Sequence, residues 1–307
     1  MKILYQGYDI TEYAHVRKCV AHDTADDRCD SLDIEFDNAA GWYGWGPQED
    51  DQIIVSHGDY DTGIMYVNTI IPVNGKFRII ATSLPSTARI RGYTSFKNNT
   101  IEEIMRICAI SSGMDYRIYG IDPDITIPYI ERNDEGYGAF LCRLLRMESA
   151  NLKCVNGRFV AIGIEWAQSR DAHQTITVKA DMSGMEYRRI GRRYRTLTIK
   201  TPWASATATD TAITGNYCIT LSHPPARDVL QAGRWARGLL LHKNRQHERL
   251  AITTDYNVGF TAMTRINIKD NTDCADAAGE WIIAQAHHDI FNKKSSVEMF
   301  RCISTIQ

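Results

Sequence analysis

The sequence predicts a β-rich α+β protein in which two antiparallel β units flank a small α+β insert. Three observations lead to this prediction. Short strands with alternating apolar and polar residues fill residues 1–95, helical patterns and a tight hairpin fill residues 96–165, and strands then resume. The chain has 307 residues, more than the roughly 250–300 at which single hydrophobic cores stop growing, so we expect two or three compact units.

The first unit is predicted from alternation and from turn residues. Leu32, Ile34 and Phe36 alternate with acidic residues, which is the period-two pattern of a strand with one solvated face. Runs rich in Ile and Val follow at 52–56, 63–71 and 76–82, separated by turn residues at 57–59 and 72–75. Residues 1–95 are therefore predicted to form a small antiparallel barrel or sandwich, and residues 166–190 are a candidate for its completion.

The insert, residues 96–165, begins with a capping box. Thr100 is placed to accept a hydrogen bond from the third helical amide, and Glu103 is placed to reach back, so a helix is predicted to begin directly after Thr100. A second helix is predicted over about 135–150, where apolar residues form one stripe. Asn156-Gly157 tolerates the two positive φ values of a type I′ turn and predicts a β-hairpin.

Beyond the insert the sequence predicts strands again, together with one long helix. Ser222 before Pro224 and Pro225 marks the start of a helix near 224–243. The predicted strands cover 175–179, 195–201, 216–221, 250–254, 262–268, 279–290 and 297–303. We therefore assign residues 191–307 to a second β-rich unit that includes this helix.

Composition and charge limit the classes of function. Hydrophobic residues make up 44% and charged residues 23%, which is typical of a chain that folds throughout. Lys plus Arg number 35 and Asp plus Glu 37, so the net charge of −2 provides no field for nucleic acid or an anionic membrane. No apolar run is long enough for a secretion signal or a membrane span, so we expect a protein made in the cytoplasm.

The cysteines and the motif search argue against a catalytic or metal site. The eight cysteines are scattered without a C-x-x-C pair, so we expect reduced thiols rather than disulfides or a zinc knuckle. The phosphate-binding glycine motifs, the H-E-x-x-H zinc motif and the G-x-S-x-G nucleophile motif are absent. We therefore predict no catalytic, cofactor-binding or metal-binding residues, no cofactor, and a protein that is not an enzyme.

Two histidine groups come nearest to a metal site. His287 and His288 are neighbours in a predicted strand and point to opposite faces, so they cannot bind one ion together unless a bulge intervenes. His242 and His247, with Glu248 beside them, are five residues apart, which is off the i, i+4 spacing of a helical zinc site. We expect no metal at either group.

Two other segments are candidates for contact with a partner. Five Arg residues stand at 188, 189, 192, 193 and 195, and they either keep a solvated strand edge charged or meet phosphate or a protein interface. The segment 41–47 contains two Trp and one Tyr, which either cover the end of their own β unit or present a stacking platform to a glycan or a partner. The acidic residues 49–51 lack calcium-loop spacing and are interpreted as turn residues.

A series of short motifs spans the first half of the chain. The motifs are Leu32-x-Ile34-x-Phe36, Trp42, Trp45, Pro47, Gln52 to Val55, Gly63 to Val67, Ser83-Leu84-Pro85, Ser95 to Thr100, Arg132 to Glu135 and Leu152-Lys153-x-x-Asn156-Gly157. This series resembles the late-control protein D family, the baseplate hub proteins of contractile phage tails and phage-tail-like bacteriocins (tailocins). The type VI secretion spike contains a similar hub part. Beyond about residue 165 the resemblance rests on the order of elements.

The resemblance implies a fold, an assembly and partners. Two tail-tube-like antiparallel β-barrels would flank the insert, and three copies would form a ring that adapts a sixfold tail tube to a threefold central spike. Closed homo-oligomers of this kind are common among soluble proteins. The expected partners are two further copies, the tail tube protein, the central spike protein and other baseplate proteins. The protein would be made in the bacterial cytoplasm and would become part of the assembled tail or virion baseplate.

Two alternatives stay open on the sequence. A β-rich module could bind a glycan or a cell surface through the loop from Trp42 to Trp45, or the chain could be a peptidoglycan hydrolase associated with a hub. Glycan affinity of the monomer would favour the first alternative, and muralytic activity of the purified protein would favour the second. A trimeric ring would favour the structural hub.

Overall fold

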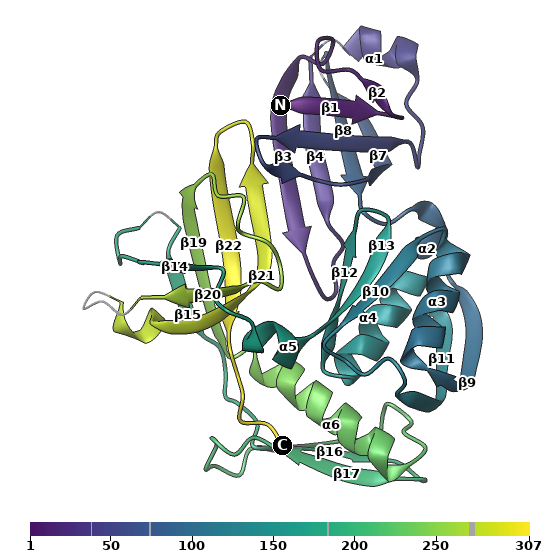
Figure 1. Ribbon diagram of the computed structural model, residues 1–307, viewed down its shortest axis with the longest axis vertical. Helices are drawn as coiled ribbons and strands as arrows, with labels where there is room; N and C mark the ends of the chain where they lie inside the picture. Colours follow the sequence, from purple (N-terminus) through teal and green to yellow (C-terminus); the bar gives the residue numbers. More distant parts are fainter. Residues whose placement is uncertain (38, 74, 183, 270–273) are drawn as a thin grey trace.

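The computed structural model describes residues 1–37, 39–73, 75–182, 184–269 and 274–307, so Asn74 of the predicted turn at 72–75 lies outside the described residues. Three bodies are visible in Figure 1: a first β unit at the top, a second β unit at the left, and an α+β body at the lower right. Strands outnumber helices in the described residues, and the predicted β-rich α+β class is confirmed.

The first β unit is a curled sheet. It contains β1 (Lys2–Tyr5), β2 (Tyr8–Asp9), β3 (Val16–Thr24), β4 (Ser31–Phe36), α1 (Ala39–Trp45), β5 (Gln52–His57), β6 (Tyr60–Asp61), β7 (Met65–Val73) and β8 (Lys76–Thr82). The pairing order is β3-β4-β8-β7-β5-β1-β2, and β6 pairs with β5. The sheet curls so that β1 and β7 cross over β3 and β4 (Figure 1). Leu32, Ile34 and Phe36 are fully buried in its core, which confirms the alternation read from the sequence.

The second β unit has its own core around Trp281. It contains β14 (Gln174–Ile176), β15 (Glu186–Arg189), β19 (Glu248–Asp255), β20 (Arg265–Ile268), the 3₁₀ helix η1 (Ala275–Ala277), β21 (Gly279–Asp289) and β22 (Lys294–Arg301). β14 pairs with β20 and β15 pairs with β19, so these strands from residues 166–190 do not complete the first unit. The strands with which they pair lie at residues 248–255 and 265–268.

One sheet runs through the two β units. β3 pairs antiparallel with β21, from Thr24 opposite Gln285 to Val20 opposite Asp289. The backbone of the first unit is therefore hydrogen-bonded directly to that of the second. Over the described residues the strand pairing follows an open path in each unit, and the closed barrels stay a prediction.

The insert forms most of the α+β body. The body contains α2 (Ser86–Arg89), β9 (Gly92–Thr100), α3 (Ile101–Ser112), β10 (Asp115–Tyr119), β11 (Thr126–Glu135), α4 (Tyr137–Met147), β12 (Ala150–Val155), β13 (Arg158–Gly163) and α5 (Ile164–Ser169). Its bounds are therefore wider than the predicted 96–165, because α2 and the start of β9 precede that range and α5 continues beyond it. The capping box is confirmed, because Thr100 Oγ1 accepts from the Glu103 amide at 3.1 Å and the Thr100 amide donates to Glu103 Oε2 at 3.0 Å. The hairpin is confirmed by φ values of 47° at Asn156 and 69° at Gly157.

Residues 196–244 leave the second β unit and pack on the insert. They form β16 (Thr196–Lys200), β17 (Ser205–Thr209), β18 (Cys218–Leu221) and α6 (Val229–Asn244), which is the predicted long helix. It begins at Val229 and not near 224 after Ser222, because the Asp228 carboxylate caps it by accepting from the Gln231 amide at 2.7 Å. A Cβ on Gly238 would lie 2.1 Å from the Met147 carbonyl oxygen, so glycine allows α6 to approach α4 closely. The predicted unit 191–307 is thus distributed over two bodies, because Trp235 of α6 is buried in the core of the insert.

Candidate functional site

The three bodies meet at the turn between β3 and β4, residues 25–30. This turn extends from the first β unit into the α+β body beside β12 (Figure 1). The Asp26 amide donates to the Leu152 carbonyl oxygen at 2.8 Å. Asp26 has a φ of 83°, in a region that few residues other than glycine adopt, and Asp is one of those that tolerate it. The turn is therefore held by contacts outside its own strands.

Lys153 of β12 binds the base of this turn through two ion pairs. Its Nζ lies 2.5 Å from Asp23 Oδ1 and 3.2 Å from Asp30 Oδ2, and the Lys153 side chain is 8% exposed. Burial raises the pKa of the Asp30 carboxyl, and the Lys153 charge opposes this rise. Burial also disfavours the charged form of Lys153, but Asp30 and Asp23 outweigh it and raise the Lys153 pKa. Lys153 therefore stays charged and fixes the first unit to the insert.

Asp26 is the centre of a second ion cluster. Its Oδ1 accepts from Nε and Nη2 of Arg146 on α4 at 3.1 and 3.0 Å. Its Oδ2 accepts from Nη2 of Arg245, directly after α6, at 2.6 Å. One carboxylate of the first β unit therefore connects two helices of the α+β body. Charge-assisted bonds of this kind are about twice as strong as neutral ones.

Arg245 and His242 form the inner part of this cluster. The Arg245 side chain is 2% exposed, and its Nη1 donates to Asn151 Oδ1 at 2.8 Å. Burial lowers the pKa of Arg245 to about 10, so the guanidinium stays charged at neutral pH. Burial and then the Arg245 charge lower the pKa of His242 to about 2. The His242 ring is therefore neutral, and its Nδ1 accepts from Arg245 Nη2 at 2.8 Å.

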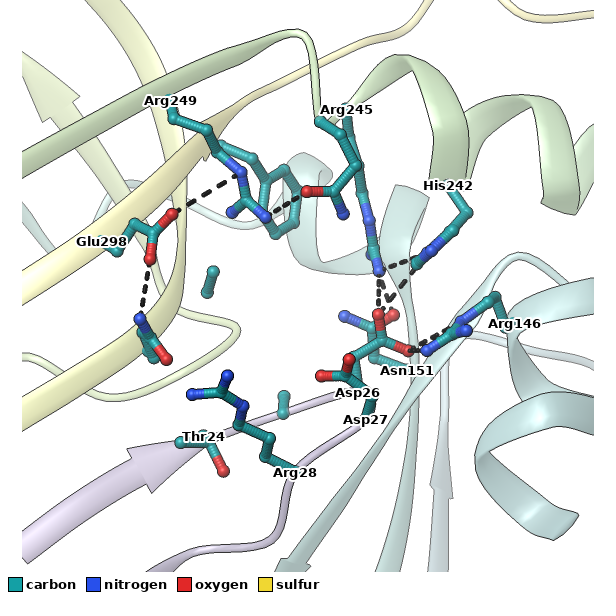
Figure 2. A pocket seen from close by; sticks show the side chains of 15 residues that line it. Thr24, Asp26, Asp27, Arg28, Arg146, Asn151, His242, Arg245, Arg249 and Glu298 are labelled. Atoms are coloured by element: carbon teal, nitrogen blue, oxygen red, sulfur yellow. Dashed lines mark hydrogen bonds and ion pairs between the residues drawn. The ribbon is translucent and has the colours of Figure 1, made fainter. Parts of the chain in front are cut away.

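A cavity of about 390 Å³ opens beside the Asp26 cluster. Its walls come from every body: the β3–β4 turn, α4, β12, α6, β19, β21 and β22 (Figure 2). β21 has a bulge between Ile283 and Gln285, at the wall where Ala284 and Gln285 line the cavity. The charged side chains of the lining are Asp26, Asp27, Arg28, Arg146, Arg245, Arg249 and Glu298. The cavity is thus polar and lies at the joint between the bodies.

A second buried carboxylate connects α4 to α6. Glu148 follows α4, and its Oε1 accepts from Trp235 Nε1 at 2.8 Å while its Oε2 accepts from Arg234 Nε at 3.0 Å. Burial raises the pKa of Glu148, and Arg234 opposes the rise. The residues 196–244 are therefore attached to the insert by a buried polar contact as well as by apolar packing.

The predicted histidine pair lies where β21 meets β3. The two rings diverge: His288 is fully buried, with Nδ1 3.0 Å from Ser295 Oγ and Nε2 2.9 Å from the Phe260 carbonyl oxygen. The His287 ring meets the His22 ring edge-on, with centroids 4.4 Å apart. Burial lowers the pKa of His22 to about 4 and also lowers that of His287. These rings are neutral at pH 7 and act as packing groups in the joint sheet.

The second histidine group does not come together. His242 belongs to the Asp26 cluster, whereas His247 Nδ1 lies 3.0 Å from the Ile190 carbonyl oxygen. Glu248 accepts from Arg301 and from the Tyr187 hydroxyl. Among the residues that the structure describes, no group of three or more His, Cys, Asp or Glu is arranged to hold a metal ion.

The arginine run divides into exposed and structural residues. Arg188 and Arg189 lie on β15 and are exposed, and Arg188 pairs with Glu186 of the same strand. Arg192 is exposed as well. Arg193 differs, because it pairs with Asp210, whose side chain is fully buried. The run is therefore not a uniform solvated edge, and substitution of Arg193 would disturb the fold.

The aromatic segment covers the end of its own β unit, as one of the two sequence readings expected. Trp42 is 5% exposed and stacks on Phe36 with ring centroids 4.1 Å apart. Trp45 stacks on Trp42 at 5.2 Å but stays 44% exposed. The acidic residues that follow serve local structure: Asp50 accepts from the Ser86 amide and Asp51 accepts from the Tyr5 hydroxyl.

Sequence reasoning named two residues of the joint, but not for their role there: His242 as a metal-ligand candidate and Lys153 as part of a family motif. Lys153 stands between two apolar residues in a strand that is buried on its two faces, so it breaks no alternation. A usable signal was the run Asp23 to Asp30, which has four Asp and one Arg within eight residues beside a predicted strand. Arg245 gave no signal of its own, because cationic residues are expected at a helix C-terminus.

No helix in the described part of the chain is long and apolar enough to span a lipid bilayer. No protein-family model matches the sequence, and no curated protein sequence matches it. Solved structures, however, share its fold over nearly the whole chain.

The 43 kDa tail protein of prophage MuSo2 from Shewanella oneidensis has a TM-score of 0.73 at 15% identity, and the match covers 98% of this chain and 97% of that chain. A tail protein from Neisseria meningitidis has a TM-score of 0.75 at 10% identity, with 98% and 95% covered. An E. coli component of the type VI secretion system, described as similar to the T4 bacteriophage tail proteins gp27 and gp5, has a TM-score of 0.61 at 10% identity, with 99% and 77% covered. The chain therefore shares the fold of phage tail proteins, as the family resemblance led us to expect, while the two closed barrels stay a prediction.

Proposed function

We propose that this chain is a structural, non-enzymatic hub protein in the baseplate of a contractile phage tail or a phage-tail-like particle. Three copies would form a ring between the sixfold tail tube and the threefold central spike. The observation that carries the proposal is the pairing of β3 with β21, which places two β units of one chain side by side in one sheet. The likeness of the fold to phage tail proteins supports it.

The symmetry argument follows from the duplicated β units. A ring of three chains with two units each presents six units, so each unit can face one subunit of a sixfold tube. Each unit would close into a tail-tube-like barrel in the assembled ring. The ring would bind the tail tube protein on one side, the spike protein on the other side, and neighbouring baseplate proteins. The likeness to a type VI secretion component supports a place next to a spike.

We place a contact between neighbouring copies at β15. This strand stands at the end of the pairing order of the large sheet, and it exposes Arg188 and Arg189. Exposed Arg192 follows it. Charged side chains on an edge strand prevent unspecific sheet extension, and at an interface they select a complementary partner.

The mass and shape of the assembled protein test the proposal. Three copies of a 34.8 kDa chain give a species of about 104 kDa in light scattering, alone or with the cognate tube and spike proteins. Negative-stain images should show rings with six peripheral densities. A species of 34.8 kDa that persists in the presence of both partner proteins would contradict the hub function.

A further inference from the structure

Two arginines that line the cavity at the joint have buried hydrogen-bond donors that lack an acceptor. In the described residues, Nε of Arg245 and Nη1 of Arg249 are buried and have no hydrogen-bond partner. Arg245 is 2% exposed, so bulk water does not reach its side chain. Buried donors in native proteins are nearly always paired, and an unpaired donor on a charged group is especially costly. These two N–H groups therefore leave hydrogen-bonding capacity beside the cavity that the chain itself does not fill.

The charges of the lining indicate the sign of this acceptor. The lining contains four Arg and three carboxylates, and Arg146 and Arg245 share the single carboxylate of Asp26. Arg28 is exposed, and no hydrogen bond or ion pair holds it within the described part of the chain. Figure 2 shows Arg28 and Arg249 reaching toward the hollow from opposite walls. After burial, the charges of Arg245 and Arg146 are the main causes of the low His242 pKa, which indicates a positive potential at the inner wall.

We propose that this cavity binds one carboxylate group, held between the guanidinium groups of Arg28 and Arg249 and beside Arg245. The planar fork of Arg matches a carboxylate in two-point contact. A doubly charged phosphate fits less well, because Asp26, Asp27 and Glu298 line the same cavity and would repel the second charge more strongly. The carboxylate can come from a Glu or Asp side chain of a neighbouring protein or from a small free acid. This inference does not depend on the proposed function.

Titration of the full chain with small anions tests the proposal. The probes are N-acetylglutamic acid α-amide, which presents a side-chain carboxylate beside peptide groups, sodium acetate, sodium phosphate and sodium chloride at equal ionic strength. We expect at least one carboxylate probe to raise the thermal midpoint more than chloride and phosphate do. A response to the glutamate derivative alone identifies a protein side chain as the source, and an equal response to acetate identifies a free acid.

Variants of Arg28 show whether the response comes from this cavity. Arg28→Ala should weaken carboxylate binding roughly tenfold, because one charge-assisted pair is lost. Arg28→Lys keeps the charge without the planar fork and should give an intermediate affinity. The matched control is Arg106→Ala, which removes an exposed Arg of α3 outside the cavity and should leave the affinity unchanged. Equal responses of the wild type to carboxylate and chloride, or equal carboxylate affinity of Arg28→Ala and the wild type, would overturn the proposal.

Discussion

Replacement of Lys153 by Met should detach the β3–β4 turn from the insert. The ammonium group is paired with Asp23 at 2.5 Å and Asp30 at 3.2 Å, and all three side chains are at most 12% exposed. Removal of one partner from a buried ion pair costs about 3–5 kcal/mol, because the remaining charge is left without compensation. Here two carboxylates would be left, so we expect the upper part of this range at pH 8.

The cost should depend on pH in a defined direction. Burial raises the pKa of Asp30 to about 7 in the wild type, and loss of the opposing Lys153 charge would raise it further. Below pH 7 Asp30 is protonated in wild type and variant, so the difference in stability between them is the cost of leaving Asp23 without its partner. Above pH 7 the wild type ionises Asp30 while the folded variant keeps the proton, so the difference grows by about 1.4 kcal/mol per pH unit.

Native-state hydrogen exchange at pH 6, 7 and 8.5 measures this effect locally. Protection should fall first at residues 20–34 of Lys153→Met, and Lys153→Met combined with Asp30→Asn should recover part of it. The matched control is Lys76→Met, which removes a surface pair with Glu35 at 2.9 Å and should cost less than about 1 kcal/mol. A Lys153→Met variant with a loss of stability equal to that of the control, or independent of pH, would refute the reasoning.

Three further outcomes are expected. Between pH 7 and pH 5 the free energy of unfolding of the wild type should fall by about 2 kcal/mol through His242, because the folded ring with a pKa of about 2 stays neutral while the unfolded one takes up a proton. In urea unfolding, His242→Gln should lose less stability over this pH range, and a loss equal to that of the wild type would show that His242 is not the cause. Leu144→Asp buries a charge in the core that the insert shares with α6, so hydrogen exchange should rise across residues 100–165 and 229–244 together. A rise confined to residues 100–165 would show that the insert and α6 unfold independently. Arg188→Glu combined with Arg192→Glu should lower the trimer fraction in light scattering and leave the thermal midpoint unchanged, whereas Arg193→Glu should lower the midpoint because it removes the ion-pair partner of buried Asp210. A normal trimer fraction in the double variant would show that β15 is not the contact between copies.

Elements with local signals were predictable from the sequence. The helix after Thr100 is fixed by a capping box within four residues, and the turn at Asn156 is fixed by two residues that accept positive φ. β4 follows from an alternation that its own six residues display. In each case the physical cause lies within one turn or one strand, so the sequence displays it.

Elements fixed by distant partners were not predictable. β9 and β11 pair with each other across the chain, from Gly92 opposite Glu135 to Thr100 opposite Thr126, and β9 has a polar sequence that does not favour a strand by itself. Lys153 pairs with carboxylates 123 and 130 residues away, and no local pattern reports such a contact. The placement of α6 on the insert depends on the close approach of Gly238 to the carbonyl oxygen at the end of α4. This contact joins two helices that are far apart in the sequence, so no local pattern predicts it.

The joint between the bodies also constrains how they can move. β3 is hydrogen-bonded to β21, and the turn at its end is bound by Lys153, Arg146 and Arg245. Rotation of one β unit against the other must therefore break backbone pairs, and withdrawal of the turn from the insert must leave buried charges unpaired. Buried ion pairs add little net stability over apolar contacts, but they penalise other arrangements strongly. The proposed ring with six units at even spacing would require a fixed angle between the two units of each chain, and this joint would supply that constraint within the monomer.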